Sequence, residues 1–304
     1  MASWKDYLHL NFLVFIWGFT AILGLLISIP AVEVVLFRTF LSVIALGFVM
    51  VIMKKNLREI RLKQVIKIIL VGFIIAAHWI LFFASARVSN ASVSLAGLAT
   101  CALWTSFLEP MVFKKKIKGY EVTLGLVIIV GLYIIFKFEF SHKLGLFMAV
   151  LSAMMAAIFS VINGSIVRKY DPYVITFYEM SGAFLGTAIF LPIYSIYFTE
   201  GGQLQLLPTL SDWVYLLILS LVCTVYAFSA SVELLKRITV FASNLTINME
   251  PVYGIILALL FFGEKERMGG GFYLGASVIV GAILSYPLLN KYFKRKALET
   301  SNLR

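Results

Sequence analysis

The sequence predicts an all-α integral membrane protein whose ten transmembrane helices form two inverted five-helix repeats. Hydrophobic side chains make up 61% of the 304 residues and charged ones only 13%, whereas soluble domains contain about 45–50% and about 25%. The chain also contains ten long apolar runs, and a helix needs about 20 apolar residues to cross a bilayer. Segments of the two halves align with each other. This composition leaves no room for a soluble catalytic domain.

The apolar runs are predicted to be helices because they are continuous and about twice as long as the alternating strands of a membrane barrel. In chain order, the predicted spans are 8–28, 33–53, 65–86, 91–113, 121–137, 144–166, 173–197, 213–234, 240–263 and 271–290. Charge or turn signals close them, in order at Pro30, Lys54, Arg87, Lys114, Lys137, Arg168, Glu200, Lys236, Glu264 and Lys291. The first run is too long for a signal peptide and no cleavage site follows it, so it is predicted to be retained.

The basic residues predict the orientation. Most of the 26 Lys and Arg residues fall on the side of the N-terminus, in connections such as 54–63 and 114–118 and in the segment 291–304. On the opposite side, the connection 198–212 contains Glu200 and Asp212 and no cation. Cytoplasmic loops are enriched in Lys and Arg, so both termini are predicted to be cytoplasmic. The net charge of +11 therefore points to a membrane surface and not to nucleic acid.

An internal repeat is visible when residues 90–134 are laid over 240–284 without a gap. The clustered glycines match: Gly119 with Gly269, Gly125 with Gly275, and Gly131 with Gly281. A repeat of five helices ends on the side of the membrane opposite to its start, so the second copy begins from that other side. The two copies are therefore predicted to have inverted topology. The predicted domains are residues 1–137 and 144–290, followed by a basic cytoplasmic tail at 291–304.

Polar and aromatic residues inside the spans are the candidates for a binding site, because polar groups at membrane depth are costly and usually functional. Aromatic faces with a few hydrogen-bonding groups suit a small organic solute better than a bare ion. Each aromatic residue can equally be a packing or interfacial residue. The residues predicted to bind substrate are Trp17, His78, Trp79, Trp104, Asn163, Tyr226, Asn244 and Asn248.

The ninth span leaves two alternatives open. Asn244 and Asn248 share one helical face with Pro251, whereas Glu250 points about 200° away from Asn248 in a regular helix. Either the asparagines face the pathway and Glu250 packs against a neighbouring helix, or the helix loosens at Pro251. Burial favours the neutral form of a carboxyl group, so Glu250 is a proton-coupling candidate. A purely structural hydrogen bond is the alternative.

Three further ionisable residues inside spans are candidates for a role in transport. His78 is the second proton-coupling candidate, because imidazole titrates near physiological pH; a role as a hydrogen-bonding wall residue is the alternative. Arg38 and Glu179 lie about two turns inside opposite faces of the membrane, which makes them gate candidates and makes a direct ion pair between them doubtful. Gly182 and Gly186 are predicted to serve helix packing.

Enzyme motifs are missing from the sequence: it has no HExxH, no GxSxG, no Walker-type loop and no Cys/His cluster. Cys101 and Cys223 lie in apolar runs and form no metal or redox motif. We therefore expect no catalytic residues, no metal and no cofactor.

The pattern resembles the EamA-type members of the drug/metabolite transporter superfamily, which include bacterial exporters of amino acids and other metabolites. The resemblance covers nearly the whole chain and rests on its ten spans and on Trp17-Gly18, Arg38, Glu250-Pro251, Gly263-Glu264-Lys265, Gly275 and Gly281. The first half departs from the motif, with Cys101 where the second half has Pro251 and Lys114 where it has Glu264.

The resemblance implies a carrier whose central cavity is lined mainly by spans 1, 3, 4, 6, 8 and 9. The predicted function is a multi-pass secondary transporter of the bacterial cytoplasmic membrane that exports small metabolites such as amino acids by alternating access. Proton coupling is a hypothesis that accompanies this prediction. Its predicted partners are a small-molecule substrate and membrane lipids; the sequence does not give the oligomeric state. The alternative is a flippase for lipids or lipid-linked intermediates with the same architecture.

Overall fold

The structure, a computed structural model, describes residues 2–138, 142–266 and 268–301, and within these ranges it contains helices and no strands. The α-helices are α1 (Trp4–Gly18), α2 (Thr20–Leu26), α3 (Ala31–Ile52), α4 (Leu62–Val88), α5 (Ala91–Leu98), α6 (Cys101–Phe113), α7 (Gly119–Phe138), α8 (Lys143–Ile166), α9 (Pro172–Phe198), α10 (Leu210–Leu217), α11 (Ala227–Leu234), α12 (Val240–Ile247), α13 (Glu250–Phe262) and α14 (Gly270–Ser301). A π-helix (Ile218–Tyr226) joins α10 to α11. Short 3-10 turns cover Leu57–Glu59, Glu200–Gly202 and Gly263–Glu266.

These helices confirm the prediction of an all-α membrane protein. In the described part of the chain, nine helical segments are long and apolar enough to cross a membrane. The fifth predicted span, 121–137, corresponds to α7, whose apolar segment, Gly119–Ile135, is shorter. The predicted and observed spans differ by only a few residues at each end, except at α14, which continues through Ser301. The described part of the predicted tail is therefore helical.

Three of the spans are interrupted near their middle. The first span breaks at Phe19, between α1 and α2. The fourth breaks at Ala99–Thr100, between α5 and α6, and the ninth at Asn248–Met249, between α12 and α13. Pro251 lies in the first turn of α13, where its missing N–H costs no helical hydrogen bond. Each interruption frees backbone groups in the middle of the bundle, which in a membrane is tolerated only where protein or a cavity surrounds them.

The fourth and ninth spans share one pattern. Each consists of an 8-residue helix followed by a 13-residue helix, with a two-residue break between them. The two interrupted spans pack crosswise, α5 against α13 and α6 against α12. This duplication agrees with the sequence repeat, and the inverted topology of the two halves stays a prediction.

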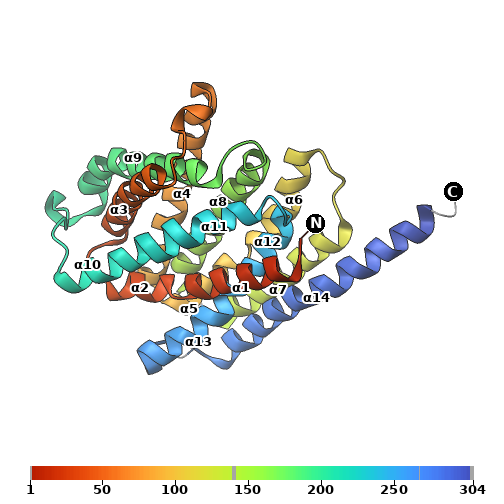
Figure 1. The fold of residues 1–304 in the computed structure, drawn as a ribbon. Coiled ribbons are helices and arrows are strands. Elements are labelled where there is room, and N and C mark those ends of the chain that lie inside the picture. The colour runs from red at the N-terminus through yellow and green to blue at the C-terminus, as the bar shows by residue number, and fades with distance from the viewer. Residues whose placement is uncertain (1, 139–141, 267, 302–304) are drawn as a thin grey trace.

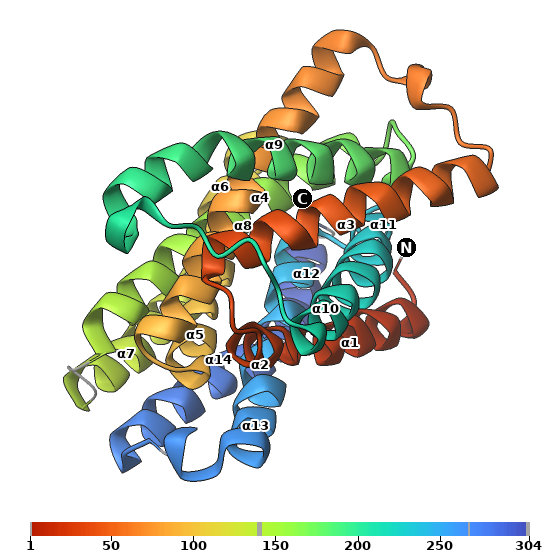
Figure 2. The same ribbon diagram turned by 90° about the vertical axis from the view of Figure 1, so that its left-hand side faces the viewer.

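Glycines bring other helices together closely. A Cβ atom added at Gly182 of α9 would overlap the backbone of α4 at Ile69, and one added at Gly72 of α4 would overlap α9. Gly131 of α7 and Gly275 of α14 approach each other in the same way. Figure 2 shows α7 and α14 lying along one side of the molecule. The N-terminus lies on the same side of the bundle as the long C-terminal extension of α14 (Figure 1).

A central cavity at the helix interruptions

A cavity of about 90 Å³ lies where the interrupted spans meet. Its wall is largely apolar and aromatic, with a few polar and charged groups. The lining residues are Trp17, Thr20, Arg38, His78, Trp79, Phe82, Leu98, Cys101, Ala156, Phe159, Ser160, Asn163, Cys223, Phe228, Ser231, Val232, Leu235, Ser243, Asn244, Ile247 and Glu250. A concave apolar site with a few convergent polar groups is the usual form of a small-molecule site.

The interruption of the ninth span turns two faces of its sequence toward the same cavity. Asn244, in the last turns of α12, and Glu250, the first residue of α13, both line the cavity. They would lie on different sides of a regular helix. Of the two alternatives for this span, the structure therefore has the loosened helix. The break lies at Asn248–Met249, just before Pro251.

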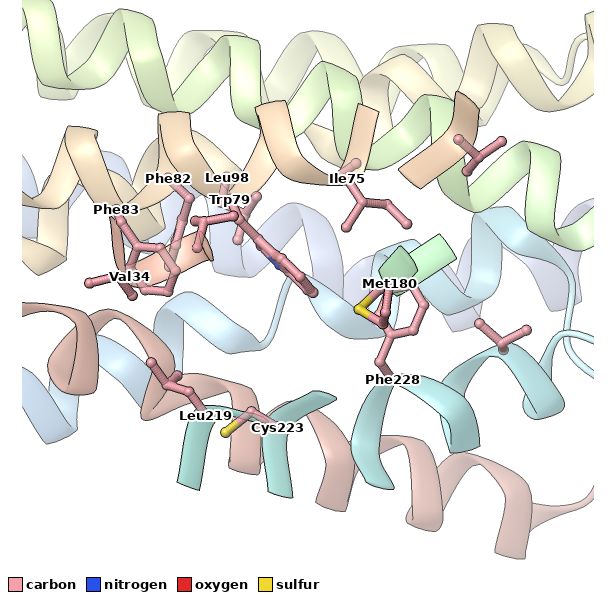
Figure 3. Packing of buried hydrophobic residues seen from close by; sticks show 14 of the residues in the cluster. Val34, Ile75, Trp79, Phe82, Phe83, Leu98, Met180, Leu219, Cys223 and Phe228 are labelled. Atoms are coloured by element: carbon pink, nitrogen blue, oxygen red, sulfur yellow. The ribbon is translucent and has the colours of Figure 1, made fainter. Parts of the chain in front are cut away.

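Arg38 of α3 is buried in the cavity wall and held on two sides. Its Nε donates a hydrogen bond to Thr224 Oγ1 (2.8 Å), and its Cζ lies 3.8 Å from the centre of the Trp79 ring. The positive charge of Arg38 also acts on the carboxyl group of Glu250. Figure 3 shows Trp79 projecting from α4 into the space toward Cys223 and Phe228. Arg38 was predicted as a gate candidate, and it lines the cavity.

His78 is fixed by the backbone of α8. Its Nδ1 lies 2.9 Å from the Ser152 carbonyl oxygen, and Ser152 Oγ donates back to the His78 carbonyl (2.9 Å). When Nδ1–H donates to Ser152, Nε2 is left as an acceptor in the neutral ring. The rings of Phe82 and Phe159 flank the imidazole, so His78 presents one polar atom in an aromatic wall.

The π-helix connects the cavity to the first and second spans. Thr224 Oγ1 donates to the Leu219 carbonyl, five residues earlier, and Trp17 Nε1 donates to the Cys223 carbonyl (2.9 Å). Ser220 Oγ donates to the Arg38 carbonyl (3.1 Å). The widened turn of a π-helix releases carbonyls for such bonds, and π segments are frequent at functional sites.

Several predicted site residues do not line the cavity. Asn248 and Glu179 are buried outside it, Trp104 is partly buried outside it, and Tyr226 lies at the surface, where its hydroxyl contacts His9 Nε2 (3.2 Å). A constant rotation of 100° per residue placed Tyr226 on an inner face, but Tyr226 ends the π-helix, where that rotation does not hold. Trp104 comes after the break at Ala99–Thr100, so the constant rotation does not predict the direction of its side chain either. Trp17, His78, Trp79, Asn163, Asn244 and Glu250 line the cavity.

Polar atoms close to the cavity lack hydrogen-bond partners. They include Asn163 Oδ1, Ser229 Oγ, Asn248 Nδ2 and both carboxyl oxygens of Glu179. Buried polar groups without partners are rare in native proteins and call for an explanation. Asn244, by contrast, donates from Nδ2 to Thr105 Oγ1 (2.7 Å), which joins α12 to α6.

One end of the bundle is closed by polar contacts that sequence reasoning missed. Asp212 accepts hydrogen bonds from the backbone N–H (2.7 Å) and the hydroxyl (2.6 Å) of Ser28. Arg87 donates to the carbonyls of Gly24, Ile27 and Ile29 at the end of the first span. We call Asp212, Ser28 and Arg87 the distal tie. The acidic connection 198–212 was noted for its charge, but spacing does not reveal its partner.

The other end of the bundle is where α1 begins and α11 ends, and the cavity extends toward it. Leu235, which follows the last residue of α11, lines the cavity. Ion pairs here join Asp6 to Arg237 (2.9 Å) and Lys55 to Asp171 (2.6 Å). The hydrogen bond to Asp171 raises the pKa of Lys55, which lies in a connection outside the spans.

Glu109, which the sequence did not single out, joins the fourth span to the ninth. One carboxyl oxygen accepts from the backbone N–H of Phe241 (2.6 Å) at the start of α12. The other binds Lys115 Nζ (3.2 Å). A carboxylate at a helix N-terminus is favourable, so Glu109 fixes the start of α12 against α6.

The described residues contain no group of three or more His, Cys, Asp or Glu side chains that could hold a metal ion. The cavity therefore offers binding through aromatic rings, hydroxyls, amides, one imidazole, one guanidinium and one carboxyl group.

The fold and the cavity define a multi-pass membrane protein with a central, largely apolar cavity. Residues 143–290 match the family model of the EamA-like transporter family, which is consistent with an EamA-type multi-pass transporter of the drug/metabolite transporter superfamily. A solved structure titled "Crystal structure of protein" has the same fold, with a TM-score of 0.68 and 15% sequence identity over 96% of this chain and 99% of that one. The search of curated proteins found no match.

Proposed function

We propose that this chain is a secondary transporter that exports small amphipathic metabolites such as amino acids across the bacterial cytoplasmic membrane. The observation that carries the proposal is the composition of the cavity wall, in which aromatic rings surround a guanidinium and a carboxyl group. Arg38 suits a carboxylate and Glu250 an amine, while Phe159 and Phe228 suit an apolar side chain. Such a site binds solutes and performs no chemistry on them, in agreement with the absence of enzyme motifs in the sequence.

Alternating access gives the two ends of the bundle different roles. The cavity extends toward the end that holds the N-terminus, and the distal tie closes the opposite end. With both termini in the cytoplasm, as the basic residues predict, this conformation faces inward. Rupture of the distal tie, together with closure between α1, α11 and α12, would then open the cavity to the outside.

Proton coupling belongs to the same proposal through His78 and Glu250. Both line the cavity, and both can change charge in response to a bound solute. Arg38 acts as a ligand in this proposal, because it is held by Thr224 and Trp79 inside the cavity.

A thermal-shift screen of the purified protein tests the binding site. The probes are amino acids, nucleosides, sugars and cationic drugs, because a ligand that binds the folded state raises its stability, by about 2.7 kcal/mol at 100 times its Kd. A stabilising amino acid should lose most of its effect in Asn244→Ala. Tyr226→Phe is the matched control, since this ring lies at the surface, and it should respond as the wild type does.

Liposome assays separate transport from lipid flipping. Counterflow of the stabilising solute in vesicles supports the exporter. If a solute stabilises Asn244→Ala as much as it stabilises the wild type, the proposed binding site is wrong. Movement of a labelled phospholipid without solute counterflow would replace the proposal with a flippase.

A further inference from the structure

Glu179 is a buried carboxyl group that has no donor. It lies on α9, its residue is 0% exposed, and neither carboxyl oxygen has a hydrogen-bond partner. The other buried carboxyl groups of the described residues each have a hydrogen-bond donor or a cation: Glu109 has Lys115, Glu121 has Lys118, Asp212 has Ser28, Glu33 has the Gln205 backbone and Glu250 has the charge of Arg38.

No charged group among the described residues compensates Glu179. Helix α9 packs against α3, α4 and α11, whose ionisable side chains include Arg38, Lys67, His78 and Glu233. None of these acts on Glu179, and the only side chain that does is the amide of Asn163 on α8. An ionised carboxylate without a donor or a cation costs several kcal/mol in such a site. The neutral form of the carboxyl group avoids this cost.

Asn163 lies between this carboxyl group and the cavity. Its residue is 1% exposed and lines the cavity, and its Oδ1 has no donor. The O–H of a protonated Glu179 is a donor beside this acceptor. One proton on Glu179 would therefore give these three oxygens, two from Glu179 and one from Asn163, a shared hydrogen bond.

We propose that Glu179 and Asn163 form a proton-binding site beside the cavity, and that Asn163 links the proton to the occupancy of the cavity. A solute that donates to Asn163 Oδ1 competes with the Glu179 O–H for that acceptor and favours release of the proton, which leaves a carboxylate at Glu179 and enters the water of the cavity. By reciprocity, protonation of Glu179 weakens the binding of that solute to the same degree. This second step rests on the proposed function; the proton site does not.

A metal cation fits this place less well than a proton. Cations such as Ca²⁺ need six or more oxygen ligands, or several waters beside them, whereas the site offers three side-chain oxygens. No second carboxylate among the described residues acts on Glu179.

Infrared spectroscopy of the full chain in lipid nanodiscs tests the proton site directly. Wild type at neutral pH should show the C=O stretch of a protonated carboxyl group, and Glu179→Gln should lose intensity in that band. Glu121→Gln is the matched control, because Glu121 is buried but paired with Lys118 at 2.7 Å, and it should keep the band. Unchanged intensity in Glu179→Gln would overturn the proposal.

A second variant keeps Glu179 and tests the role of Asn163. Removal of the side chain in Asn163→Ala should shift the pH at which half of the band disappears by about 1 unit, the equivalent of one hydrogen bond. An unchanged titration would overturn the link. Loss of the band at constant pH when NaCl replaces choline chloride would mean a sodium site and would overturn the proton assignment. Neither spectrum requires transport, so these tests fail or succeed independently of the exporter proposal.

Discussion

At the residue scale, the sequence identified many of the polar and aromatic residues of the cavity because polar groups inside apolar runs stand out. Trp17, His78 and Asn244 were found in this way, and they line the cavity. The partners of these residues were beyond prediction, because a hydrogen bond such as that from Arg38 to Thr224 joins residues 186 positions apart. Glu109 was not among the predicted site residues, although it holds the start of α12, because its contact with Phe241 joins residues 132 positions apart.

Arg38 gives a prediction at this scale. Arg38→Lys keeps the charge but loses the planar stacking on Trp79 at 3.8 Å, and a desolvated cation–π contact contributes about 2 kcal/mol. We expect the free energy of unfolding to fall by about 1–2 kcal/mol in a denaturant titration of the detergent-solubilised protein. The exposed Arg61 supplies the control, Arg61→Lys, which should be neutral. Equal stability of the two variants would mean that the stacking contributes nothing.

At the scale of single elements, the sequence predicted where helices begin and end but not where they break. Apolar content and flanking charges define a span, whereas the break at Ala99–Thr100 carries no proline or glycine within it. The sequence did not predict the π-helix either, because the extra residue per turn does not change the amino-acid composition of the segment. These irregularities decide which side chains face the cavity, and they explain why Trp104 and Tyr226 were placed on the wrong face.

The contact between α4 and α9 gives the element-scale prediction. Gly182→Ala would bring a methyl group into the backbone at Ile69, and overpacking of this kind costs about 1–3 kcal/mol. The melting temperature should fall accordingly. Gly47→Ala is the matched control on α3, because the nearest atom to its added Cβ is 4.0 Å away. A melting temperature in Gly182→Ala as high as in Gly47→Ala would show that the helices separate at no cost.

At the scale of the whole molecule, the distal tie and the cavity predict how the protein moves. Cys101 and Cys223 both line the cavity and are natural reporters of access. Asp212→Ala removes both hydrogen bonds to the side chain and backbone of Ser28, so the outward-facing state should gain population. We expect a membrane-impermeant thiol reagent applied to the outer face to label the protein several-fold faster.

The control for this experiment is Glu200→Ala, which removes a carboxylate from the same connection at an exposed position. It should label at the wild-type rate. Equal rates in the two variants would mean that the Asp212 contacts do not hold the outer end closed.

The length of α14 has a practical consequence. Its 32 residues extend over about 48 Å at about 1.5 Å per residue, whereas the hydrocarbon layer is about 30 Å thick. Figure 1 shows the C-terminal part of α14 reaching beyond the bundle. This extension works as a built-in rigid spacer. A fluorescent protein fused after it would be held at a defined distance from the bilayer, so energy transfer to a dye in the lipid headgroups would report tilting of α14 during a transport cycle.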